Sequence, residues 1–181
     1  PVLICFSSRL IIEWEVLRVA NQRASVSVLF VCLGNICRSP TAQGIFQEHV
    51  NAEDLSNLIY IDSAGTGDWH IGKNPDSRSC QAALDRGIDI SSLQARLIQK
   101  EDFERFDYIL VMDKKNLKEV SKMKPPDYSG HLGLFLSFSL NPSIQEVPDP
   151  YFSGADGFEL VIDLVMDASK GLLKHIKKQL L

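Results

Sequence analysis

One strand–turn–helix unit constrains the fold of this chain more than any other segment. Residues 26–31 form an apolar run that is rich in β-branched valine and carries no charge, a pattern that is typical of a buried parallel strand. Ser39 and Pro40 then follow as a predicted helix N-cap and first helical residue. Cys32 therefore lies at a strand-to-helix turn, where backbone N–H groups and the helix dipole favour an anion.

The remaining sequence alternates between strand and helix patterns. Apolar runs predict three more strands, at residues 58–62, 108–112 and 132–138. Helical patterns lie between and after them, at residues 41–50, 76–87, 114–122 and 158–181. Gly87 is suited to a left-handed helix end, and Asp113 can cap the helix that follows it. This order predicts an α/β fold with a parallel sheet of four strands and helices on both faces.

Composition excludes several classes of protein. The 181 residues are 45% hydrophobic, which suits one compact domain, and the net charge of −4 argues against a nucleic-acid partner. No uncharged apolar stretch is long enough to predict a membrane span. The four cysteines show no paired framework, so we expect a reducing, cytoplasmic setting.

The first 25 residues differ from the rest. They lack the cationic start and the small-residue cleavage site of a secretory signal. We expect residues 1–25 to form an extension outside the catalytic unit, and residues 26–181 to form the catalytic domain.

The segment from Cys32 to Ser39 contains the groups needed to hold and attack a phosphate. Five residues separate Cys32 from Arg38, so the chain can curl around one oxyanion, and the planar guanidinium can bind two phosphate oxygens. Such surroundings favour the thiolate, which is the nucleophilic form of cysteine. Gly34 allows close backbone approach, and Asn35 tolerates a left-handed conformation. Ser39 can donate a hydrogen bond to the sulfur.

Two other interpretations of this segment are weaker. Cys32 and Cys37 have the spacing of half a zinc site, but a second half is missing, because Cys80 is solitary and His70 is ten residues from it. A nucleotide-binding P-loop is also a poor match, because no Gly-Lys-Ser/Thr follows the glycine.

A second signal lies downstream of the cysteine segment, in the acidic residue Asp149 and its flanking prolines. A phosphoryl ester leaves poorly as an alkoxide or phenolate, so hydrolysis through a phosphocysteine benefits from a general acid. Pro150 biases Asp149 toward an extended backbone. A lone Asp-Pro would be an ordinary turn. Together with the cysteine segment, it predicts a proton donor.

Over residues 26–181 the chain resembles the low-molecular-weight protein-tyrosine phosphatases. The matching segments are residues 31–40, 62–66, 74–78, 106–113 and 149–151. The resemblance implies a flavodoxin-like fold, a Cys32 nucleophile, an Arg38 phosphate clamp, an Asp149 acid, and no metal or organic cofactor. It implies that Ser63 hydrogen-bonds Asn35. It also implies an aromatic-substrate slot with walls formed by Leu33, Ile36, Trp69, Tyr151 and Phe152.

The chain departs from the family pattern at three positions. The segment 91–94, which includes Leu93, lacks the family's frequent histidine, so a brace for Asn35 is missing or replaced. Phe152 stands where many relatives have tyrosine, and Gln43 stands where glutamate is common.

Related activities use a similar loop. Arsenate reductases need further cysteines that Cys80 does not supply, and arginine phosphatases tend to have threonine at the position of Ile36. Ile36 and Tyr151 favour phosphotyrosine or a small aryl phosphate as the substrate. A non-enzymatic phosphotyrosine-binding module is a further alternative, and the intact Cys32, Arg38 and Asp149 count against it. We expect a monomer, and a Cys32–Cys37 disulfide that forms on oxidation.

Overall fold

A computed structural model describes residues 26–141 and 143–180. Its sheet contains four strands: β1 (Val26–Cys32), β2 (Ile59–Gly65), β3 (Tyr108–Val111) and β4 (His131–Leu134). All pairs are parallel, in the spatial order β2-β1-β3-β4. The predicted four-stranded, flavodoxin-like α/β fold is confirmed. The expected extension at residues 1–25 lies outside the described residues and stays a prediction.

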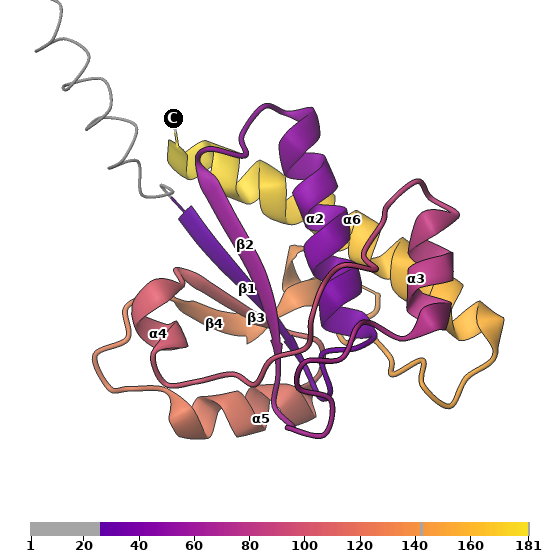
Figure 1. Cartoon of the computed structure of the whole chain (residues 1–181). Helices are drawn as coiled ribbons and strands as arrows, with labels where there is room; N and C mark the ends of the chain where they lie inside the picture. Colours follow the sequence, from indigo (N-terminus) through magenta and orange to yellow (C-terminus); the bar gives the residue numbers. More distant parts are fainter. Residues whose placement is uncertain (1–25, 142, 181) are drawn as a thin grey trace, which may run out of the picture.

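Helices cover both faces of the sheet (Figure 1). On one side lie α2 (Arg38–Ala52), α3 (Ser77–Leu84) and α6 (Ala155–Leu180). On the other side lie the short α4 (Asp102–Arg105) and α5 (Lys114–Met123). In the described part of the chain, no helix combines the length and the apolar character needed to cross a membrane.

Strand β1 lies in the middle of the core, and all seven of its residues are buried. Val28 and Phe30 pack into the cluster under α2 and α6, whereas Leu29 and Val31 pack into the cluster on the opposite face. This alternation follows from the two-residue period of a strand. Each such side chain contributes about 1.5–3 kcal/mol on full burial, so β1 anchors the segment that follows it.

The structure corrects the predicted end of the fourth strand. Strand β4 ends at Leu134, and residues that we expected to continue it form a 3-10 helix, η1 (Phe135–Phe138). Phe135 is fully buried there, with its ring centroid 4.9 Å from that of Phe30. The apolar pattern reflects this burial, and a short apolar run does not distinguish a strand from a tight helical turn. The four-residue α4 was not predicted, and α6 begins three residues earlier than we expected.

The other helix signals are largely confirmed. Asp113 caps α5 by accepting a hydrogen bond from the N–H of Asn116, and Asp76 caps α3 in the same way. Gly87 has a φ of 79°, which is the left-handed conformation predicted for it, in the turn after α3.

The strand order places a topological switch point beside β1. After β1 the chain moves to β2 on one side, and later to β3 on the other side. The connections therefore diverge at the carboxyl ends of β1 and β3, which is where open α/β sheets bind ligands. Cys32 is the last residue of β1, so the candidate nucleophile lies at this point.

Candidate active site

The segment of residues 32–38, here called the cysteine loop, connects β1 to α2. Helix α2 begins at Arg38, and its N-cap is Cys37, whose side chain makes no capping hydrogen bond. The predicted cap at Ser39 is therefore wrong. Ser39 lies in the first helical turn, fully buried, with its Oγ 3.1 Å from Cys32 Sγ. A thiolate can only accept, so this hydroxyl is in place to donate to the sulfur, as its predicted role requires.

Asn35 connects the cysteine loop to neighbouring segments through buried hydrogen bonds. Its φ is 54°, the left-handed conformation expected for it, and its backbone N–H donates to Cys32 Sγ at 3.2 Å. Its buried side-chain amide donates to Ser39 Oγ at 2.8 Å and to Ser63 Oγ at 2.9 Å. Its side-chain oxygen accepts from the N–H of Arg96 at 2.9 Å. The hydrogen bond between Asn35 and Ser63 that the resemblance implied is present.

The contacts of Asn35 also show which groups hold its side chain when the segment 91–94 has no histidine. Leu93 packs partly buried against the core, and the backbone N–H of Arg96 acts as the partner of the Asn35 oxygen. Gln43 accepts a hydrogen bond from Ser63 Oγ at 2.7 Å, which fixes the hydroxyl that holds Asn35. The Asn35 side chain therefore has hydrogen-bond partners without a histidine at position 93.

Arg38 is 97% shielded from solvent and lies between two carboxylates. Its Nη1 donates to Asp113 at 2.6 Å and to the Val147 carbonyl at 3.2 Å. Its Nη2 donates to Asp149 at 3.1 Å. Burial alone would lower the pKa of the guanidinium, but Cys32 and the two carboxylates outweigh it and raise the pKa. Arg38 is thus a fixed cation.

Asp113 is a site residue that the sequence analysis missed. We identified it only as a helix cap, and the structure gives it a second contact, because one oxygen caps α5 and the other binds Arg38. A usable signal was present: Asp113 follows β3 almost directly, and the carboxyl ends of adjacent parallel strands meet at one edge of the sheet.

Asp149 extends from the irregular segment before α6 to the same point. Its Oδ2 binds Arg38, and its Oδ1 accepts from the N–H of Tyr151 at 3.1 Å. Its side chain remains 45% exposed. A carboxylate that is fixed on one side and open on the other is suited to exchange a proton with a bound molecule.

These groups open onto a cavity of about 310 Å³. Cys32, Arg38 and Asp149 form its polar part. Its remaining lining consists of other cysteine-loop residues and the predicted slot residues, namely Leu33, Gly34, Ile36, Cys37, Trp69, Tyr151 and Phe152, together with His70. Asn35, Ser39 and Ser63 do not line it, and all three are buried. His70 was not predicted as part of this site. A side chain added at Gly34 would crowd its ring, with a Cβ 3.0 Å from His70 Cδ2.

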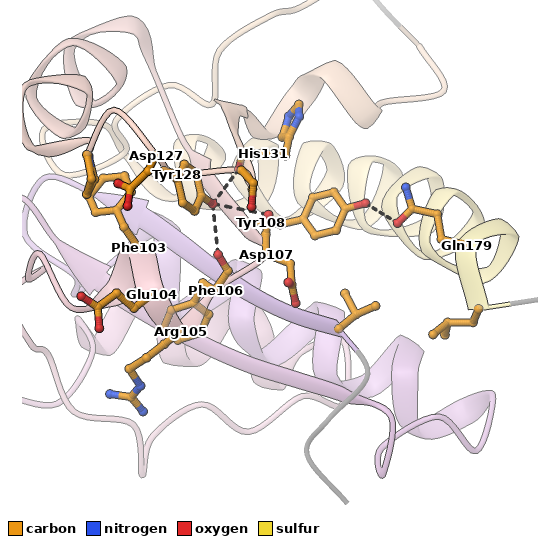
Figure 2. Close-up of a pocket in the computed structure, with 15 residues that line it drawn as sticks. Phe103, Glu104, Arg105, Phe106, Asp107, Tyr108, Asp127, Tyr128, His131 and Gln179 are labelled. Atoms are coloured by element: carbon orange, nitrogen blue, oxygen red, sulfur yellow. Dashed lines mark hydrogen bonds between the residues drawn. The ribbon is translucent and has the colours of Figure 1, made fainter.

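A larger cavity, of about 940 Å³, lies at the other edge of the sheet (Figure 2). It is formed around Tyr108, Tyr128 and His131, near the amino ends of β3 and β4. Tyr128 directs its hydroxyl at backbone carbonyls, including that of Phe106 at 3.1 Å. The cavity contains no cysteine and lies at the wrong end of the strands for a switch-point site. Size therefore does not identify the active site here.

The second cysteine of the loop has a different character from Cys32. Burial raises the pKa of the Cys37 thiol to about 12, so Cys37 is neutral near pH 7. Cys32, Cys37 and Cys80 are all free thiols. Within the described ranges, no three histidine, cysteine or carboxylate side chains gather in a way that would hold a metal ion.

A cysteine and an arginine that face one small cavity at the switch point of a flavodoxin-like sheet are typical of phosphatases that use a cysteine nucleophile. The family model described as low molecular weight phosphotyrosine protein phosphatase matches residues 27–181. The chain belongs to this family.

Individual relatives agree with the family match. A low molecular weight phosphotyrosine protein phosphatase of Schizosaccharomyces pombe is 40% identical over 154 residues, which cover 84% of this chain and 97% of the relative. YfkJ of Bacillus subtilis is 40% identical over 155 residues, covering 85% and 97%. A crystal structure of a protein tyrosine phosphatase from Entamoeba histolytica, with Hepes in its active site, superposes with a TM-score of 0.82 at 37% identity, covering 87% of this chain and 100% of that one.

Proposed function

We propose that this enzyme hydrolyses phosphotyrosine and aryl phosphate monoesters through a phosphocysteine at Cys32. The observation that carries the proposal is the convergence of three groups on one cavity: the Cys32 thiol, the Arg38 guanidinium and the Asp149 carboxyl. They correspond to a nucleophile, an anion clamp and a proton donor. Aromatic and aliphatic side chains form the rest of the lining, which suits a phenyl ring.

In the first step, the Cys32 thiolate attacks phosphorus while the guanidinium of Arg38 holds two of the phosphoryl oxygens. The S–P bond forms, and the bond between phosphorus and the phenolic oxygen breaks. The electron pair of that bond goes to the phenolic oxygen, which takes the proton of Asp149 and leaves as a neutral phenol.

In the second step, a water molecule attacks the phosphorus of the phosphocysteine and gives a proton to the Asp149 carboxylate. The S–P bond breaks, and its electron pair returns to the sulfur. The leaving thiolate is stabilised by the Ser39 hydroxyl and the Asn35 N–H, which lie 3.1 and 3.2 Å from Sγ. Inorganic phosphate then departs.

The contacts of Arg38 support different roles for the carboxylates of Asp113 and Asp149. Asp113 is largely buried and binds Nη1 at 2.6 Å, so it orients the guanidinium. Asp149 is more exposed and binds Nη2 at 3.1 Å, a donor that the substrate phosphate would take over. Once the phosphate occupies Nη2, the partly exposed Asp149 carboxyl is free to face the leaving oxygen.

The remaining expectations about setting follow from this role. No cofactor is required in either step, and the substrate is a phosphoprotein or a small ester rather than a nucleic acid. The monomeric state and the cytoplasmic location stay predictions.

The test compares wild type, Cys32→Ser and Asp149→Asn on p-nitrophenyl phosphate and phenyl phosphate. Cys32→Ser should abolish turnover, because a serine hydroxyl is barely ionised near pH 7. Asp149→Asn should slow phenyl phosphate, which has the poorer leaving group, by about 10²–10⁴-fold and p-nitrophenyl phosphate far less. Asp127→Asn, in the larger cavity, is the matched control and should act like wild type.

Substrate class is tested with phosphotyrosine and phosphoarginine peptides of one sequence. The proposal predicts faster turnover of phosphotyrosine. Normal turnover by Cys32→Ser would refute the nucleophile, and a preference for phosphoarginine would refute the substrate class.

A further inference from the structure

The segment that carries Asp149 has little regular structure of its own. This segment, here called the acid loop, spans residues 147–154 between η1 and α6. The N–H of Val147 donates to the Met112 carbonyl at 2.8 Å, which fixes the start of the loop to the end of β3. The part after Asp149 contains internal turns, such as the hydrogen bond from Ser153 N–H to the Pro150 carbonyl. The orientation of Asp149 therefore depends on contacts between the acid loop and other parts of the chain.

Arg78, in the first turn of α3, makes such a contact. Its Nη1 donates to the carbonyl of Tyr151 at 3.1 Å, two residues after Asp149. Its guanidinium also lies against two aromatic rings, 5.3 Å from the ring centroid of Tyr151 and 4.7 Å from that of Phe158 at the start of α6. Arginine stacks on aromatic faces in this way while it donates hydrogen bonds in its plane.

Asp76 holds Arg78 in this position. One carboxylate oxygen accepts from Nε at 2.9 Å, and the other accepts from Nη2 at 2.8 Å. This two-point pairing occupies one edge of the guanidinium and leaves Nη1 directed at Tyr151. An exposed ion pair by itself contributes little to stability, so its consequence here is orientation.

Asp76 is connected to the cysteine loop as well. Its backbone N–H donates to the Ile36 carbonyl at 2.7 Å. A continuous series of contacts therefore runs from Ile36 through Asp76 and Arg78 to Tyr151. It joins the loop that carries the nucleophile to the loop that carries the acid, without passing through the cavity.

We infer that Arg78 is a positioning residue that sets the place of Asp149 relative to Cys32. The inference rests on the proposed function, in which Asp149 protonates the leaving group. Arg78 itself does not line the cavity and touches no reacting atom. Its loss changes proton delivery, because misplacement of a catalytic group by about 1 Å costs up to about 10²-fold in rate.

The test uses Arg78→Met and Arg78→Lys. Methionine keeps an unbranched apolar chain against the two rings and removes every donor. Lysine keeps the charge but cannot pair with both Asp76 oxygens while it reaches Tyr151. The matched control is Arg86→Met, since Arg86 also bridges the α3 region to α6, through Glu159 and Asp163, without contacting the acid loop.

The readout is kcat/KM across a series of aryl phosphates from good to poor leaving groups. For both Arg78 variants we expect a loss of about 10-fold or more on phenyl phosphate and less than about 3-fold on p-nitrophenyl phosphate. Arg86→Met should change neither. A role only in stability would slow both substrates alike, so an equal loss, or no loss, overturns the inference.

Amide hydrogen exchange provides a second measurement that does not depend on turnover. Peptides covering residues 149–157 should exchange faster in Arg78→Met than in wild type or Arg86→Met, and unchanged exchange counts against the inference. Wild type without aryl phosphatase activity would refute the proposed function. The role of Arg78 alone would be refuted by a different result. In that case wild type is active and Asp149→Asn is sensitive to the leaving group, but Arg78→Met is not.

Discussion

Replacing Asn35 by alanine tests the internal support of the cysteine loop. The substitution removes the three hydrogen bonds of a buried side chain, to Ser39, Ser63 and the N–H of Arg96. It also places an alanine at a φ of 54°, where asparagine is tolerated better than other residues with a Cβ.

The expected loss follows from these contacts. The Arg96 N–H is left without its acceptor, and an unsatisfied buried group costs about 1–3 kcal/mol. The left-handed conformation adds about 1 kcal/mol for alanine. We therefore expect Asn35→Ala to lower the free energy of unfolding by about 3 kcal/mol. Asn35→Gly, which avoids the backbone term, should lose about 1 kcal/mol less.

Urea unfolding measures the free energy of unfolding of both variants. An m-value equal to that of wild type shows that the unfolding transitions can be compared. Asn51→Ala is the control, because Asn51 is exposed and its loss should stay within about 0.5 kcal/mol. A loss below about 1 kcal/mol for Asn35→Ala, or a glycine variant that is less stable than the alanine variant, would show that Asn35 does not support the loop in this way.

Three further predictions concern the same loop. Arg38→Lys should lose most of kcat/KM in a steady-state assay, because an ammonium cannot replace the two-point guanidinium contact. Burial raises the pKa of Cys37 from 9.0 to about 12, so its neutral thiol stabilises the fold fully below pH 9 and loses this contribution between pH 9 and 12. Over that range, urea titrations should show a steeper loss of stability for wild type than for Cys37→Ala. Leu93→His should change neither activity nor melting temperature, because Asn35 already has all its partners.

Oxidation gives a separate prediction for the two cysteines of the loop. Peroxide should convert the Cys32 thiolate to a sulfenic acid. Cys37 then loses its proton, attacks the sulfenic sulfur and forms a disulfide with release of water, slowly near pH 7 because burial raises its pKa to about 12. A thiol reductant should then restore activity in wild type, and Cys37→Ser should recover poorly. Mass spectrometry that finds no Cys32–Cys37 bond after mild peroxide treatment would contradict this mechanism.

Local signals explain why much of the fold was predictable. The uncharged run before Cys32 is buried on both faces of the sheet, so its composition alone identifies a central parallel strand. Asp113 and Gly87 act within their own turns, and their roles as a helix cap and a left-handed residue required no tertiary information. The end of β4 was different, because Phe135 turns into the core through contacts with Phe30, which is distant in sequence.

The candidate site likewise contains some residues that the local sequence predicts and others that depend on tertiary contacts. Cys32 and Arg38 belong to one short segment, so their proximity follows from its length. Asp113 and His70 come to the site only through the sheet order and the loop after β2, and neither has a sequence motif that announces a role. The predicted N-cap, Ser39, lies two residues after the actual N-cap, Cys37, because a serine before proline matches the cap pattern even when the helix has already begun.

The central claim is that Cys32 becomes phosphorylated during turnover. Wild type and Asp149→Asn are mixed rapidly with an aryl phosphate, quenched in acid, digested and analysed by mass spectrometry. We expect one phosphoryl group on the peptide that contains Cys32, in both proteins, and none in Cys32→Ser. Turnover without a phosphorylated Cys32 peptide, or a phosphoryl group on another residue, would contradict it.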